Sequence, residues 1–123
     1  MILVDTSVWA EHIRREVRPL SALLLAGLVL AHPFVIGEIA MGNLRQRDVF
    51  LRGLQDLPQA VVATDHEVMR FIDRDRLFGS GIGYVDAHLL AAARLSSGAA
   101  LWTFNKRLNA VAARLGLAYE PAV

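Results

Sequence analysis

The chain of 123 residues contains no cysteine. Disulfide bonds, cysteine-based zinc sites and thiol catalysis are therefore excluded. A long hydrophobic run is also missing, because the most apolar stretch, residues 20–31, is bounded by Pro19 and by His32-Pro33. A membrane-spanning helix needs about 20 apolar residues, so this stretch is too short to cross a bilayer. The apolar start has no basic segment of the kind that opens a secretory signal, and we expect a cytoplasmic protein with no membrane partner.

Lysine is nearly absent, since Lys106 is the only lysine among 13 basic residues. Arginine, which supplies the rest, binds phosphate through parallel hydrogen bonds and would suit an RNA backbone. Codon use in a G+C-rich genome explains the arginines and the many alanines more simply. Because the net charge is only +1, we favour that explanation, and charge alone does not indicate a nucleic-acid binder.

Charged residues of all kinds make up 20% of the chain, whereas 54% of it is hydrophobic. Typical globular domains have about 25% charged and about 45–50% apolar residues. The chain is long enough for one ordinary domain, which we assign to residues 1–123. Its apolar excess exceeds the need of one small core, so we expect a homodimer face or a groove for a partner helix to cover the remainder.

Short apolar runs alternate with helical patterns along the chain. The runs predict buried strands at residues 1–4, 29–31, 60–63 and 100–103. The intervening segments predict helices, including one from Pro33 to about Leu44 and one from Tyr84 to Leu95, with Ser7 expected to cap the first helix. This alternation indicates an α/β fold whose parallel sheet is covered by helices on both faces. Ligands of such sheets bind beyond the carboxyl ends of the strands.

Three acidic residues lie in apolar surroundings. Asp5 follows Met1-Ile2-Leu3-Val4, Glu38 lies within Val35-Ile36-Gly37-Glu38-Ile39, and Asp86 opens a run rich in alanine and leucine. No Lys or Arg lies within four positions of any of them. A buried carboxylate without a partner either takes up a proton or pairs with a cation. A shared metal ion would serve all three.

Each acid has an ordinary explanation when it is considered alone. Asp5 fits a turn, Glu38 an exposed helix face, and Asp86 a first-turn position, where the helix dipole favours an anion. Together they favour a metal site for phosphoryl transfer. Mg²⁺ prefers oxygen ligands and keeps several waters, and such an ion lowers the pKa of a bound water and neutralises charge on a phosphoryl oxygen.

Asn105 follows the apolar segment 100–104 and is expected at a strand end, as Asp5 is. It is a candidate fourth ligand, but an asparagine there also suits the N-cap of the following helix. A zinc site is discounted, because none of the four histidines is paired at a His-x3-His spacing.

Four motifs together resemble the PIN domain, and within it the VapC-type toxins of bacterial toxin–antitoxin pairs. The start, Met1 to Trp9, looks like the first motif, Glu38 after Pro33 the second, and Gly83-Tyr84-Val85-Asp86-Ala87-His88 the third. The segment Leu101 to Leu108 is similar to the fourth, in which an Asp is usual where this chain has Asn105. The likeness covers the whole chain, in order and at family length.

The resemblance implies a three-layer α/β/α sandwich and a Mg²⁺- or Mn²⁺-dependent endoribonuclease, dimeric and inhibited by a cognate antitoxin. Asp5, Glu38 and Asp86 carry over as catalytic, metal-binding residues, with Ser7 and Thr103 as candidate supports. Lys106 and Arg107 are candidates for contact with the RNA backbone. The alternative is a catalytically weak PIN-like binding module that acts within an antitoxin repressor complex, since a neutral amide at 105 binds a divalent cation more weakly than a carboxylate does.

Overall fold

The computed structural model describes residues 1–121. Its elements follow one another as β1 (Ile2–Val4), α1 (Thr6–Arg14), α2 (Arg18–Leu25), β2 (Val29–Leu30), α3 (Pro33–Ala40), α4 (Arg47–Asp56), α5 (Asp65–Arg74), α6 (Tyr84–Leu95), β3 (Ala100–Trp102) and α7 (Lys106–Arg114). No helix in this part of the chain has the length and hydrophobicity to cross a membrane.

The three strands form a parallel sheet in the order β2-β1-β3. Ile2 pairs with Val29 on one side and with Ala100 on the other, so the first strand of the chain is the central one. Isolated parallel bridges extend the sheet at both edges, from Ala31 to Gln59 and from Leu101 to Ala118. Parallel strands need long crossovers, and helices supply them here.

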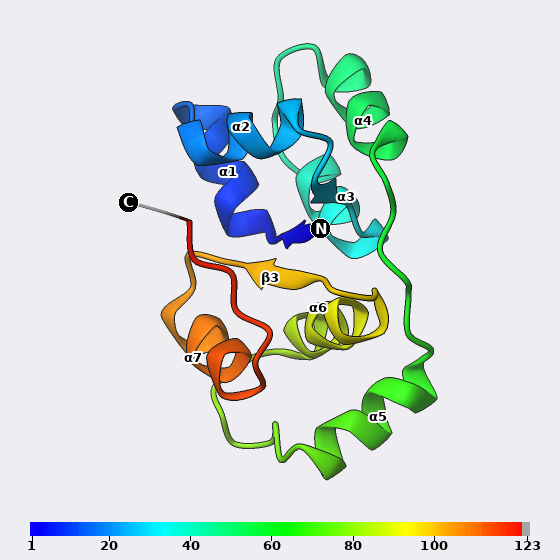
Figure 1. Cartoon of the computed structure of the whole chain (residues 1–123). Helices are drawn as coiled ribbons and strands as arrows, with labels where there is room; N and C mark the ends of the chain where they lie inside the picture. Colours follow the sequence, from blue (N-terminus) through cyan, green and yellow to red (C-terminus); the bar gives the residue numbers. More distant parts are fainter. Residues whose placement is uncertain (122–123) are drawn as a thin grey trace.

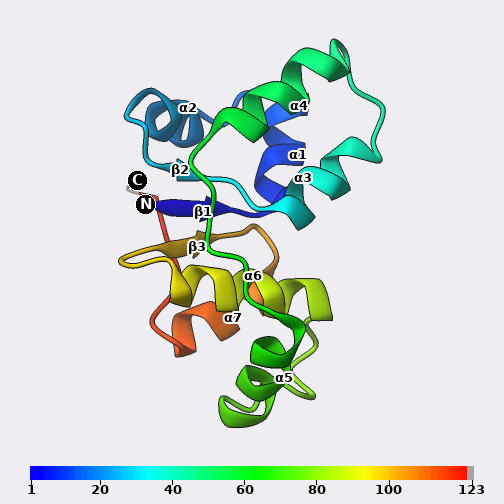
Figure 2. The same cartoon turned by 90° about the vertical axis from the view of Figure 1, so that its right-hand side faces the viewer.

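Helices cover the sheet on two sides. The helices α1 to α4 lie above the strands in Figure 1 and α5 to α7 lie below them, an arrangement that the perpendicular view in Figure 2 repeats. The helix α6 packs against β3 and β1, and every residue from Ala87 to Ala93 is buried. This confirms the predicted α/β sandwich with a central parallel sheet.

Two local predictions differ from the structure. Residues 60–63 form no strand, because only Gln59 and Ala60 join the edge of β2, and Val61 and Val62 are about half exposed, at 49% and 48%. This segment instead runs as an extended connection from α4 to α5 (Figure 2). The helix carrying Glu38 ends at Ala40 rather than near Leu44, since Gly42 and Asn43 follow within one turn and favour its termination.

The ends of the strands determine where polar groups meet. The carboxyl ends of β1 and β3 lie side by side, with Val4 paired to Trp102. Asp5 follows one strand and Thr103 follows the other, so both lie at the same edge of the sheet. This is the edge at which ligands bind in parallel α/β folds.

Candidate active site

Asp5 is the most enclosed acid in this region, with only 7% of its surface exposed. Its Oδ2 accepts hydrogen bonds from Ser7 Oγ at 2.8 Å and from Thr103 Oγ1 at 2.7 Å. The structure therefore brings together Asp5 and the two hydroxyl residues that the sequence predicted as its supports. Ser7 does not cap α1 as predicted. The helix begins two residues earlier than a Ser7 cap would require, at Thr6, and Asp5 occupies the N-cap position.

The two hydroxyl groups are themselves held by the turn after β3. The backbone N–H of Phe104 donates to Ser7 Oγ at 3.0 Å, and that of Asn105 donates to Thr103 Oγ1 at 3.0 Å. The distance between Ser7 Oγ and Thr103 Oγ1 is 3.2 Å. Each hydroxyl thus accepts one hydrogen bond from the backbone and donates its own proton to Asp5. The result is a fixed orientation for the Asp5 carboxylate.

Asp86 lies half-buried in the first turn of α6. Burial raises the pKa of its carboxyl group, and the negative charge of Asp5 raises it further, whereas the N–H of Gly83 at 3.1 Å from Oδ2 acts in the opposite direction. The effect of Asp5 on Asp86 places the two acids within electrostatic reach of one another. A like charge in a partly desolvated region opposes ionisation of Asp86.

Glu38 lies on α3 and is exposed, so the expectation that all three acids are buried is wrong for this residue. Its apolar neighbours in the sequence, Val35 and Ile39, are buried, whereas Glu38 itself lies on the solvent-exposed part of the helix surface. Glu38 Oε1 accepts a hydrogen bond from Thr6 Oγ1 at 2.7 Å. Thr6 follows Asp5 directly, and this contact ties Glu38 to the start of α1.

The three carboxylates have no protein cation as a partner. Within residues 1–121, no Lys, Arg or His side chain forms an ion pair with Asp5, Glu38 or Asp86. Nor do three or more His, Asp or Glu side chains in that range lie close enough together to hold a metal ion as they stand. Uncompensated carboxylates repel one another, and Mg²⁺ commonly uses only one or two carboxylates together with waters. The pair Asp5 and Asp86 satisfies that smaller requirement.

Asn105 caps the last helix. Its Oδ1 accepts from the backbone N–H of Leu108 at 3.1 Å, and its side chain is exposed. The cap that the sequence offered as an alternative role is therefore formed. Because Oδ1 is engaged, the remaining polar atom of the side chain is Nδ2, which is a hydrogen-bond donor and does not bind a cation.

Basic groups lie at the start of the same helix. Lys106 and Arg107 are its first two residues and both are exposed. Arg107 lies against the glycine-rich loop that leads to Asp86, since a Cβ at Gly81 would be 2.9 Å from Arg107 Cδ. Gly81 also has φ +86°, a conformation that favours glycine. The loop thus lets an arginine lie close to its backbone at Gly81.

Thr6 is the polar neighbour that the sequence reasoning did not single out. The sequence shows Thr6 only as a hydroxyl residue between Asp5 and Ser7 at the start of a helix. At such a position helix capping is the ordinary expectation, rather than a contact with a distant acid. The contact with Glu38 spans 32 positions and depends on how α1 packs against α3.

Comparison with known proteins bears on this arrangement. The family described as "PIN domain" matches residues 2–114, a range that includes all three acids and Asn105. The chain is similar to "Ribonuclease VapC32" of Mycobacterium tuberculosis, with 50% identity over 123 residues that cover 100% of this chain and 99% of the relative, in strains CDC 1551 and H37Rv alike.

Proposed function

This chain belongs to the PIN-domain family, and on that premise we propose that it is a metal-dependent endoribonuclease that acts as the toxin of a toxin–antitoxin pair. One observation carries the proposal. The charge of Asp5 helps to raise the pKa of Asp86, and no Lys, Arg or His among residues 1–121 pairs with either acid. The 50% identity to a ribonuclease along the whole chain supports RNA as the substrate.

The residues at this edge fit a hard divalent cation, Mg²⁺ or Mn²⁺. Carboxylate oxygens are the ligands that such ions prefer, and few of them are needed. For each acid the described hydrogen bonds engage only one oxygen, which leaves the other for a cation. When bound, the cation supplies Lewis-acid chemistry, because it lowers the pKa of a bound water and neutralises charge on a phosphoryl oxygen.

The chain's own groups orient those ligands. Ser7 and Thr103 hold Oδ2 of Asp5, so that Oδ1 is presented in one direction. The N–H of Gly83 does the same for Asp86, and the hydroxyl of Thr6 does so for Glu38. Outer hydrogen bonds of this kind fix the orientation of metal ligands and tune their affinity.

We assign Lys106 and Arg107 to contact with the RNA backbone. Both are exposed at the start of α7, next to Asn105, and Arg107 lies against the loop that leads to Asp86. Contacts with phosphate position a nucleic acid without reading its bases. The proposal therefore assigns the two residues to holding the scissile strand and leaves target choice to other features.

The proposed partners are RNA, a cognate antitoxin protein and a second copy of the chain, in the cytoplasm. The antitoxin is expected to cover apolar surface and to reach the site. The alternative function, a catalytically weak binding module within a repressor complex, is favoured by one observation. At position 105, where the family usually has Asp, this chain has a neutral residue that is already engaged as a helix cap.

Cleavage of an RNA pool by the purified protein distinguishes the two functions. We expect cutting with Mg²⁺ or Mn²⁺, loss of cutting in EDTA, and recovery when Mn²⁺ is added back. Equal cutting in EDTA would contradict the metal-dependent mechanism. Intact RNA under every metal condition, together with binding of RNA or antitoxin, would favour the binding module.

Asn105→Asp is expected to tighten Mn²⁺ binding at least several-fold without destabilising α7. Aspartate caps a helix about as well as asparagine does. One oxygen can keep the contact with Leu108, while the second replaces the Nδ2 donor and adds a negative charge two residues after Thr103, whose hydroxyl holds Asp5. Calorimetric titration with Mn²⁺ measures the change. Asn109→Asp, one turn further along α7, is the matched control. Equal affinity in the two variants would mean that position 105 is structural only.

A homodimer is expected at micromolar concentration, with part of segment 20–31 in its interface. Only part of this segment is available to an interface, since Leu20 is fully buried whereas Leu25 is 91% exposed and Leu28 is 42% exposed. Covering a leucine contributes about 1.5–3 kcal/mol, so Leu25→Glu is expected to weaken association at least tenfold. Light scattering measures the mass. A wild-type protein that is monomeric without antitoxin would assign this apolar surface to the antitoxin instead.

A further inference from the structure

Two histidines in the interior have nitrogen atoms without a described partner. His32, the N-cap of α3, is fully buried, and His88 on α6 is 1% exposed. Among residues 1–121, Nε2 of His32 and Nδ1 of His88 form no hydrogen bond. Unpaired buried polar atoms are costly and rare, so each requires an explanation.

The proton on His32 can be assigned from its neighbours. The backbone N–H of Phe34 donates to its Nδ1 at 3.0 Å, so Nδ1 is the acceptor nitrogen of the ring. Burial, together with the nearby His88, lowers the pKa of His32 to about 4, and the ring is therefore neutral near pH 7. A neutral imidazole has one N–H. The unpaired Nε2 of His32 is consequently a hydrogen-bond donor.

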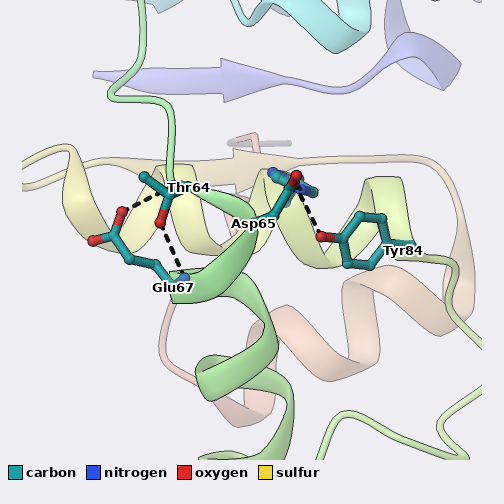
Figure 3. Close-up of polar contacts among 5 residues, drawn as sticks. Thr64, Asp65, Glu67 and Tyr84 are labelled. Carbon is teal, nitrogen blue, oxygen red and sulfur yellow. Dashed lines mark hydrogen bonds and ion pairs between the residues drawn. The ribbon is translucent and has the colours of Figure 1, made fainter.

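The opposite assignment holds for the other ring. Nε2 of His88 lies 3.2 Å from Oδ1 of Asp65, and an ionised carboxylate can only accept a hydrogen bond. Nε2 therefore carries the proton, and in the neutral ring Nδ1 is an acceptor. The hydroxyl of Tyr84 donates to the same oxygen of Asp65 at 3.2 Å (Figure 3), which helps to fix that carboxylate. The unpaired nitrogen of His88 is thus complementary to that of His32.

The two rings belong to one buried cluster. Both pack edge-on against Phe34, with ring centroids 5.1 Å from it for His32 and 4.7 Å for His88. An unpaired donor and an unpaired acceptor hence lie on rings that contact the same side chain, away from solvent. A single water can join such groups when they are polar and near one another.

We propose that one buried water accepts a hydrogen bond from His32 Nε2–H and donates one to His88 Nδ1, and that the two residues position the metal-binding carboxylates. The hydrogen bonds then run from the backbone of α3 through His32 and His88 to Asp65 at the start of α5. Glu38 lies on α3 and Asp86 lies on α6, two residues before His88. The relay fixes the start of α3 relative to α6, and Thr6 fixes α3 near its other end, at Glu38.

The first test concerns the relay in the wild-type protein without metal. Long-range ¹H–¹⁵N spectra of the imidazole groups report which nitrogen carries each proton. We expect Nε2–H on both rings and slow exchange of the His32 Nε2 proton with solvent. A proton on Nδ1 of His32, or exchange as fast as that of the exposed His66, would overturn the relay.

The second test measures coupling between the two rings. His32→Asn retains a good helix cap for α3 but removes the imidazole Nε2 donor, and His88→Phe keeps an aromatic ring without an acceptor. Residues in one hydrogen-bond network are non-additive. The double variant is therefore expected to have a urea midpoint close to that of the less stable single variant. If the stability losses of the two single variants simply add in the double variant, the water-mediated contact between the two rings is overturned.

The third test addresses positioning, and it alone rests on the proposed metal site. Loss of outer partners of metal ligands costs about 10–100-fold in affinity, and we expect His32→Asn to weaken Mn²⁺ binding about tenfold in calorimetric titration. His66→Asn on α5 serves as the control and should bind as the wild type does. Unchanged affinity in folded His32→Asn would overturn the positioning role. If the wild type itself binds no Mn²⁺, the proposed function fails, whereas the relay is still decided by the spectra and the coupling.

Discussion

Asp5→Asn is expected to leave a folded protein that cleaves RNA at least about a hundredfold more slowly than the wild type. Asparagine keeps a side-chain oxygen, which can still accept from Ser7 and Thr103, so the local structure is retained. What is lost is the charge on the oxygen that faces the cation. Lewis-acid catalysis supplies several kcal/mol of transition-state stabilisation, and each tenfold in rate corresponds to about 1.36 kcal/mol.

Initial rates on one RNA, measured over a range of Mn²⁺ concentrations, test this expectation. The matched control is Asp73→Asn, which removes an exposed carboxylate of the same chemistry from α5. That variant should cleave at the wild-type rate. An Asp5→Asn protein that reaches the wild-type rate at saturating Mn²⁺ would remove Asp5 from the catalytic groups.

Asp86→Asn is expected to stabilise the metal-free protein and to abolish the stabilisation that Mn²⁺ gives to the wild type. Burial and the charge of Asp5 raise the pKa of Asp86, so its ionised form is unfavourable in the fold. Replacing it by a neutral amide relieves that repulsion. A ligand present at 100 times its dissociation constant stabilises a protein by about 2.7 kcal/mol. The wild type should gain this amount from Mn²⁺ and the variant little of it.

The contribution of Asp86 to folding stability depends on pH, and the direction of that dependence follows from its pKa. Because the pKa of Asp86 is higher in the folded state than in the unfolded state, the folded state binds more protons as the carboxyl group titrates. Stability from this group therefore rises as pH falls through the folded pKa, and it decreases as pH increases. Urea unfolding in EDTA at several acidic pH values should show this slope in the wild type. The slope should be smaller in Asp86→Asn.

A metal-free Asp86→Asn protein that is less stable than the wild type at pH 7 would contradict the account. It would mean that the hydrogen bond from Gly83 outweighs burial and the repulsion from Asp5. An unchanged Mn²⁺ response would show that the cation binds elsewhere. Asp73→Asn again serves as the control in both measurements.

The sequence was sufficient to predict the parts of the site that depend on strand ends. Asp5 and Asn105 follow apolar runs, and parallel strands align their carboxyl ends, so their place at one edge of the sheet follows from the pattern. Thr103 was predicted as a support of Asp5 only through the family resemblance. The position of Asp86 in the first turn of a helix was predicted from the long helical pattern that begins after the glycine-rich loop. The helix bounds 84–95 were also predicted correctly, because Gly83 and Ser96 border an uninterrupted apolar pattern.

Features that depend on packing between helices were not predictable in this way. The exposure of Glu38 depends on which face of α3 meets α1, and its apolar sequence neighbours indicated the wrong face. No periodic pattern in the sequence predicts the contact of Thr6 with Glu38. The same holds for His32 and His88, which have no metal-ligand spacing in the sequence and which contact the same aromatic ring only when α3 and α6 pack together.

The position of β1 at the centre of the sheet has a consequence for the timing of synthesis. The ribosome makes this strand well before one of its two neighbours, β3, since Thr103 lies 98 positions after Asp5. Until Thr103 has been made, Asp5 lacks one of the two hydroxyl groups that orient its carboxylate. A nascent chain that ends before β3 therefore carries an incomplete site, and a working nuclease is expected only after that strand has joined the sheet.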